Sequence, residues 1–171
     1  TTYYWLALTS IMIFTFVAAG QVTVLSAVLG IDEDQQGRIT GLLGLVAEIT
    51  LIVTVALTGA WSDRIGRRPV SVLGFALMGV ALLITPFIGN VVSLLAARVV
   101  AGVGIAMITV MITAVVSDYV RNETRCKANG LLGLCNGIGA VLTFFVLLQL
   151  PKLFEQSLGM TELGAIRATY M

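Results

Sequence analysis

The sequence predicts an all-α membrane protein with five complete transmembrane helices and the start of a sixth. Of the 171 residues, 58% are hydrophobic and only 11% are charged, and the mean hydropathy is +1.01. Soluble domains are about half apolar and about a quarter charged, so a soluble fold of this length could not cover so much apolar surface. The apolar residues also gather in runs of about 20, the length that a helix needs to cross a bilayer.

Five such runs follow one another along the chain. They cover roughly residues 4–29, 39–61, 70–88, 91–117 and 128–150. Pro86 and Gly89 separate the third run from the fourth, which would otherwise read as one long helix. Residues 151–171 are predicted to form an outer loop and the start of a sixth span. The chain begins at Thr1 without a basic leader segment, and we expect it to be an excerpt of a longer protein.

The distribution of basic residues predicts the orientation of these spans. The first connection is mainly acidic and the third has no charge, whereas the second and fourth hold Arg64, Arg67, Arg68, Arg121, Arg125 and Lys127. Short loops rich in Lys and Arg stay in the cytoplasm. The N-terminus and these two connections are therefore expected on the cytoplasmic side of the plasma (inner) membrane.

Composition argues against several classes of function. The net charge is only +1 and no basic stripe is present, so nucleic acid is not an expected partner. The chain has no His, no Cys cluster with ligand spacing, no phosphate-binding loop and no activated Ser. We therefore expect no enzymatic activity, no metal and no cofactor. Cys126 and Cys135 would lie about 13 Å apart on one helix, too far for a disulfide.

The connection between the second and third runs is the most informative segment. It is predicted to be a tight hairpin loop over residues 62–69. Gly66 would supply the positive backbone angles of a sharp reversal, and Pro69 suits the first turn of the next helix. Asp63 would lie near the positive end of that helix, within reach of Arg67. By themselves, the arginines could equally be orientation signals.

Three motifs together resemble the major facilitator superfamily. The pattern of the second connection resembles that family's signature between helices two and three, with Trp61 where Leu is commoner; it reads Gly59-x-x-x-Asp63-Arg64-x-Gly66-Arg67-Arg68. The fourth run is similar to the family's fourth-helix motif, with Arg98-x-x-x-Gly102-x-Gly104-x-Ala106. The next connection is similar to the family's loop four-five, with Ser117-Asp118-Tyr119 and then Glu123-Thr124-Arg125, although Cys126 stands where Gly is usual.

The resemblance implies that residues 1–171 are the N-terminal bundle of a secondary transporter, with the C-terminal bundle absent from this chain. It implies a small-molecule solute as substrate, alternating access, and coupling to a proton or cation. By the same resemblance, Asp63 and the arginines near it latch the two bundles on the cytoplasmic side. We add Asp118 as a partner for Arg67 or Arg68. A transporter-like bundle kept as a non-transporting scaffold or sensor is the alternative.

Two ionisable residues lie within the predicted spans, Glu48 in the second and Arg98 in the fourth. Each costs about 2.5–3.5 kcal/mol at the centre of a membrane helix. Their depths match within the reach of an Arg side chain, and Gln21 falls between them. Either they form a buried structural pair, or they face a central cavity and bind substrate or exchange a proton. The family's use of the fourth-helix Arg for coupling favours the cavity.

Glycines in the last two spans predict close helix packing. Gly102 and Gly104 lie in the fourth span; Gly130, Gly133 and Gly137 form a seam in the fifth. This seam resembles the fifth-helix motif of exporters in the family, although Ile138 stands where that motif has Pro. Asn136, beside the seam, is expected to donate an interhelical hydrogen bond.

Overall fold

The computed structural model describes residues 2–28, 33–150, 164 and 168–170, and nearly all of them are helical. The predicted outer loop lies outside this part of the chain, as does most of the predicted start of a sixth span. Five of the described helices are long and apolar enough to cross a membrane, which confirms the predicted number of complete spans.

The helices follow the predicted order with longer bounds. Helix α1 covers Thr2–Thr23 and continues as a π-helix over Val24–Val28; the other long helices are α2 (Glu33–Ile65), α3 (Arg67–Ile84), α4 (Val91–Tyr119) and α5 (Arg125–Phe145). Short 3-10 turns cover Thr85–Phe87, Asn122–Thr124 and Leu147–Gln149. With 33 residues, α2 is about 50 Å long, which exceeds the hydrocarbon thickness of about 30 Å.

The predicted loop over residues 62–69 is wrong in extent. Helix α2 runs to Ile65 and α3 begins at Arg67, so Gly66 alone separates them. Gly66 has a φ of 98°, the positive angle predicted for it and the only one among the described residues. Because glycine adopts this angle without strain, one residue is enough to reverse the chain. Pro69 lies in the first turn of α3, where its missing N–H removes no helical hydrogen bond.

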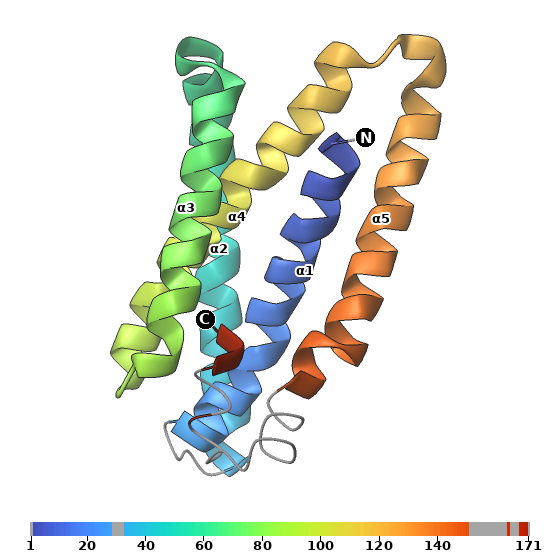
Figure 1. Ribbon diagram of the computed structural model, residues 1–171. Helices are drawn as coiled ribbons and strands as arrows, with labels where there is room; N and C mark the ends of the chain where they lie inside the picture. Colours follow the sequence, from blue (N-terminus) through green and yellow to red (C-terminus); the bar gives the residue numbers. More distant parts are fainter. Residues whose placement is uncertain (1, 29–32, 151–163, 165–167, 171) are drawn as a thin grey trace.

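Helix α4 crosses the middle of the bundle, with α2 and α3 against it, while α1 packs on α5 (Figure 1). The α2–α3 turn, the α4–α5 connection and the N-terminus lie at the same end, which we call the motif end (Figure 1). This arrangement agrees with the predicted alternation of the connections. Which side of a membrane this end faces stays a prediction.

Two glycines place α3 and α4 in backbone contact. A Cβ added to Gly104 would lie 2.7 Å from the carbonyl oxygen of Gly74 and 3.0 Å from the amide nitrogen of Met78. Gly102 packs in the same way against α2, where a Cβ would meet the side chain of Thr50 at 3.2 Å. Gly102 and Gly104 thus lie at close contacts between helices, and Gly74 is a partner of Gly104 that the sequence did not reveal.

Within the described residues, the predicted glycine seam of the fifth span makes no close helix contact. A Cβ added to Gly130, Gly133 or Gly137 would meet nothing within 4 Å in the described part of the chain. The α1–α5 contact passes instead through Gly139, where a Cβ would overlap the side chain of Ile11 and lie 3.2 Å from the carbonyl oxygen of Leu8. One turn further on, Thr143 donates to the carbonyl of Met12 at 3.2 Å. Gly139 and Thr143 make these two contacts, so the face of α5 that packs on α1 is the one that carries them and not the predicted seam.

Candidate functional site

An ion-pair cluster joins three helix ends at the motif end. Arg67, in the first turn of α3, lies 2.6 Å from the carboxylate of Asp118 near the end of α4 and 3.6 Å from that of Asp63 near the end of α2. From the sequence, either Arg67 or Arg68 could be the partner of Asp118. The structure pairs Asp118 with Arg67. Since the three side chains are one-third to two-thirds exposed, each pair has only modest strength.

The remaining motif residues surround this cluster. Arg125, at the start of α5, donates to the carbonyl of Ser117 at 2.7 Å, close to the negative end of α4, where a cation is favourable. Arg64 and Arg68 are exposed, and the described residues include no acidic side chain bound to either. Gly59 is at no close helix contact in the described part of the chain, because a Cβ there would meet nothing within 4 Å.

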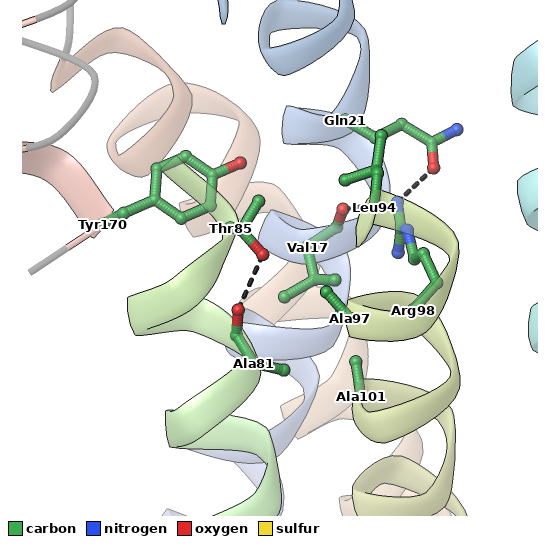
Figure 2. Close-up of a pocket in the computed structure, with 9 residues that line it drawn as sticks. All are labelled: Val17, Gln21, Ala81, Thr85, Leu94, Ala97, Arg98, Ala101 and Tyr170. Atoms are coloured by element: carbon green, nitrogen blue, oxygen red, sulfur yellow. Dashed lines mark hydrogen bonds between the residues drawn. The ribbon is translucent and has the colours of Figure 1, made fainter. Parts of the chain in front are cut away.

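Arg98 lies inside the bundle rather than on an open face. Its side chain is 9% exposed and donates to the carbonyl of Val17 at 2.8 Å and to the amide oxygen of Gln21, both on α1 (Figure 2). A cavity of about 10 Å³, the space of one water molecule, lies beside it between α1, α3 and α4. Tyr170 also lines this cavity (Figure 2). Its ring packs on Phe16, with the centroids 4.8 Å apart.

The structure does not bring Glu48 and Arg98 together. Arg98 turns toward α1, whereas Glu48 is exposed on α2, with no ion-pair or hydrogen-bond partner in the described part of the chain. The buried structural pair, one of the two alternatives that the sequence left open, is therefore wrong. The sequence indicates only how deep each residue lies along the membrane. Depth does not reveal the direction in which each helix turns its side chain. Gln21, which was expected between these two residues, accepts a hydrogen bond from Arg98.

A cleft that the sequence did not predict opens between α1, α4 and α5. Its volume is about 280 Å³, and its walls are mainly apolar. Four polar side chains reach it: Ser10, Thr109, Thr113 and Asn136. The hydroxyls of Ser10 and Thr113 donate to their own helices, at 2.8 and 3.0 Å, so they present acceptor lone pairs to the cleft.

Asn136 is the most versatile group in this cleft. It was expected to bond across helices, but within the described residues its amide has no partner. It therefore offers two donors and an acceptor to any molecule that enters the cleft. Thr109 and Thr113 follow Arg98 on the fourth span at helical spacing, a signal that could have found them, whereas no sequence signal tied Ser10 or Asn136 to the same site.

The cleft continues toward the motif end. A second hollow of about 420 Å³ shares Thr109 and Thr113 with it and reaches Asp63 and Arg67 along α2. Glu48 lies seven residues before Val55 and eleven before Gly59, which line this hollow. These spacings place the three residues on one face of α2. Glu48, the cleft and the ion-pair cluster therefore belong to one open side of the bundle, which we call the open face.

Comparisons with known proteins point to one protein family. The profile of the Major Facilitator Superfamily matches residues 4–153. The chain is 27% identical over 156 residues to the magnetosome protein MamH of Paramagnetospirillum magneticum, covering 86% of this chain and 36% of that protein. It is 30% identical over 137 residues to the inner membrane transport protein YajR of Escherichia coli, covering 80% of this chain and 28% of that protein.

A third relative is the arabinose-proton symporter of Bacillus subtilis, 25% identical over 132 residues, with 75% of this chain and 28% of that protein covered. The chain thus spans about a third of the length of these curated relatives. No solved structure matches it.

Proposed function

Because the chain belongs to the major facilitator superfamily, we propose that it is the N-terminal bundle of a secondary active transporter. In this proposal it moves a small solute by alternating access, coupled to a proton or cation. Two relatives support this class of function by their names: one is an arabinose-proton symporter, and the other is an inner membrane transport protein. The cleft on the open face is the observation that carries the proposal.

The lining of the cleft suits a solute better than it suits permanent packing. Hydroxyl and amide groups without partners are unfavourable in contact with lipid, since each lost hydrogen bond is costly there. Solvent or a ligand that fills the cleft would satisfy Thr109 and Asn136, which have no partner among the described residues. In a transporter the opposing bundle would form the other wall of this pathway.

Glu48 supports a coupled mechanism. An exposed carboxylate near the middle of a membrane helix is stable only beside water, a proton or a basic partner. On the open face it would meet the same aqueous pathway as the solute. We assign it the role of binding the coupling proton or cation. Arg98 and Gln21, bound to each other inside the bundle, would hold α1 to α4 rather than contact the solute.

The ion-pair cluster suits a latch at one end of this pathway. Asp63, Arg67 and Asp118 are partly exposed at the motif end, beside the hollow that continues from the cleft. Pairs of this strength can break and re-form during a conformational change. We propose that they fix α2, α3 and α4 in one state and that the neighbouring Arg68 contacts the opposing bundle when the cytoplasmic gate closes.

The test is a counterflow assay on the full-length protein that contains this chain, reconstituted in vesicles. Sugars, organic acids, amino acids and cationic drugs would be offered in turn. We expect one class to exchange, and we expect Asn136→Leu and Thr113→Val to abolish that exchange. Thr9→Val is the matched control, because Thr9 is exposed on α1, bonds only to its own helix and does not line the cleft.

A non-transporting scaffold predicts a different result. The folded protein would then exchange none of these solutes, and the cleft variants would behave as the parent protein does in every assay. Exchange that survives both cleft variants would refute the assigned site but would leave transport itself intact.

A further inference from the structure

A separate groove runs along the other flank of α2. Its volume is about 590 Å³, and it lies between α2 and α4. Its α2 wall includes Leu57, Trp61 and Arg64 together with Thr54, Thr58 and Ala60, and Val103 and Met107 lie on its α4 side. It shares no lining residue with the cleft or with the hollow at the motif end. The groove therefore lies apart from the open face to which we assign the solute.

The α2 wall changes chemistry along its length. Leu57, Trp61 and Arg64 follow one another at intervals of four and three residues, so they lie on one face of the helix. From Leu57 to Arg64 the wall passes from aliphatic to aromatic to cationic over about 10 Å. Leu57 is 67% exposed and Trp61 is 48% exposed, so the described protein leaves this wall largely uncovered. Trp is typical of the boundary between lipid tails and headgroups.

The charge at the end of the groove is not neutralised. Asp63 and Asp118, the acidic side chains of the ion-pair cluster, both contact Arg67, and among the described residues Arg64 has no acidic partner. Two residues further on, Gly66 precedes the first turn of α3 and provides no side-chain cap. Its free N–H groups add to the positive potential beside Arg64. This end of the groove is suited to an anion.

We propose that the groove binds an anionic phospholipid. The phosphate would contact Arg64, the glycerol region would lie beside the indole of Trp61, and an acyl chain would cover Leu57, Val103 and Met107. The order of groups along the wall matches the order of groups along such a lipid. A zwitterionic lipid fits less well, because its own cationic headgroup would offset the attraction of Arg64. This site stands independently of the transport proposal.

The test uses quenching of Trp61 fluorescence in the full-length protein embedded in phosphatidylcholine vesicles. Either brominated phosphatidylglycerol or brominated phosphatidylcholine is added over a range of mole fractions, and the difference between the parent protein and Trp61→Phe isolates the emission of Trp61. One basic residue near a membrane surface should favour the anionic lipid about fivefold. We therefore expect half-maximal quenching at a correspondingly lower fraction of phosphatidylglycerol.

Arg64→Gln should bring the phosphatidylglycerol curve close to the phosphatidylcholine curve. Arg121→Gln is the matched control, because Arg121 is an exposed arginine at the same end outside the groove, and it should leave the preference intact. High salt should narrow the preference in the parent protein itself, since exposed charges are screened, so the result does not depend on the variant folding.

Three outcomes would overturn the proposal. The two lipids would quench equally in the parent protein, or Arg64→Gln would keep the full preference, or neither lipid would quench Trp61. The third result would mean that another part of the polypeptide or a second copy covers the groove.

Discussion

The guanidinium of Arg67 lies 2.6 Å from Oδ2 of Asp118, and this contact joins the start of α3 to the end of α4. The two residues are 51 positions apart, 118 less 67, and belong to different sequence motifs. Asp63 approaches the same guanidinium less closely, at 3.6 Å. The side chain of Arg67 therefore links the turn after the second span to the connection after the fourth span.

Arg67→Ala and Asp118→Asn should behave as one unit. We expect a double-mutant cycle on thermal unfolding to give a coupling free energy of about 0.5–1 kcal/mol, because the pair is partly exposed. The cycle of Arg67→Ala with Asp63→Asn, across the longer distance, should give a smaller value. Additive losses from Arg67→Ala and Asp118→Asn, in stability and in transport, would contradict the pairing.

Gly104→Ala should destabilise the bundle. The added methyl group would press on backbone atoms of Gly74 and Met78, which cannot rotate away. Overpacking of this kind costs about 1–3 kcal/mol. The control is Gly79→Ala on α3, where a Cβ meets nothing within 4 Å and the better helix propensity of alanine should leave stability equal or higher. Unfolding midpoints that fall equally in both variants would argue against the close α3–α4 crossing.

Gly139→Ala and Gly137→Ala distinguish the observed α1–α5 contact from the predicted seam. The first variant would force Ile11 and the carbonyl of Leu8 away from α5, so we expect a lower unfolding midpoint. The second adds a methyl group to open space in the described structure and should be neutral. If Gly137→Ala were the more harmful of the two, the fifth helix would turn a different face to its neighbours than the one found.

Arg98→Gln should loosen α1 from α4. It removes the charged donor to the carbonyl of Val17, a bond that is worth about 1.5–3 kcal/mol when the donor is charged and buried. Gln21→Ala should cost less, because Val17 still accepts from Arg98. Cysteine cross-linking between α1 and α4, together with thermal unfolding, would measure the change. Full stability of Arg98→Gln would be incompatible with this structural role.

Glu48→Gln should separate exchange from accumulation. A neutral amide keeps the shape of the side chain but cannot carry a coupling proton. We expect counterflow to persist while accumulation against a gradient and its dependence on pH are lost. Uptake that still concentrates the solute, with an unchanged pH profile, would remove Glu48 from the coupling mechanism. Stability should not fall, because no described residue is bound to this carboxylate.

Part of the local geometry could be predicted because it depends on neighbouring residues alone. Gly66 and Pro69 specify the turn between α2 and α3. Asn90, which the sequence analysis did not single out, caps α4 by accepting from the backbone N–H of Ser93 at 2.7 Å. The predicted end of the second span at residue 61 falls short of the end of α2 at Ile65, because charged residues mark the end of the apolar run and not the end of the helix. Ser62 and Asp63 extend α2 by another turn.

The sequence by itself determined the class of protein, the number of complete spans and the tight turn at Gly66, because apolar run length and glycine backbone freedom are local properties. Only the tertiary structure decided that Arg98 binds α1, that Glu48 stays apart from it, that Gly139 rather than Gly137 packs on α1, and that Ser10 and Asn136 share a cleft. The physical reason is rotation. A membrane helix that is apolar on nearly all sides gives little sign of which face it turns inward, and that face is fixed only by the helices packed against it.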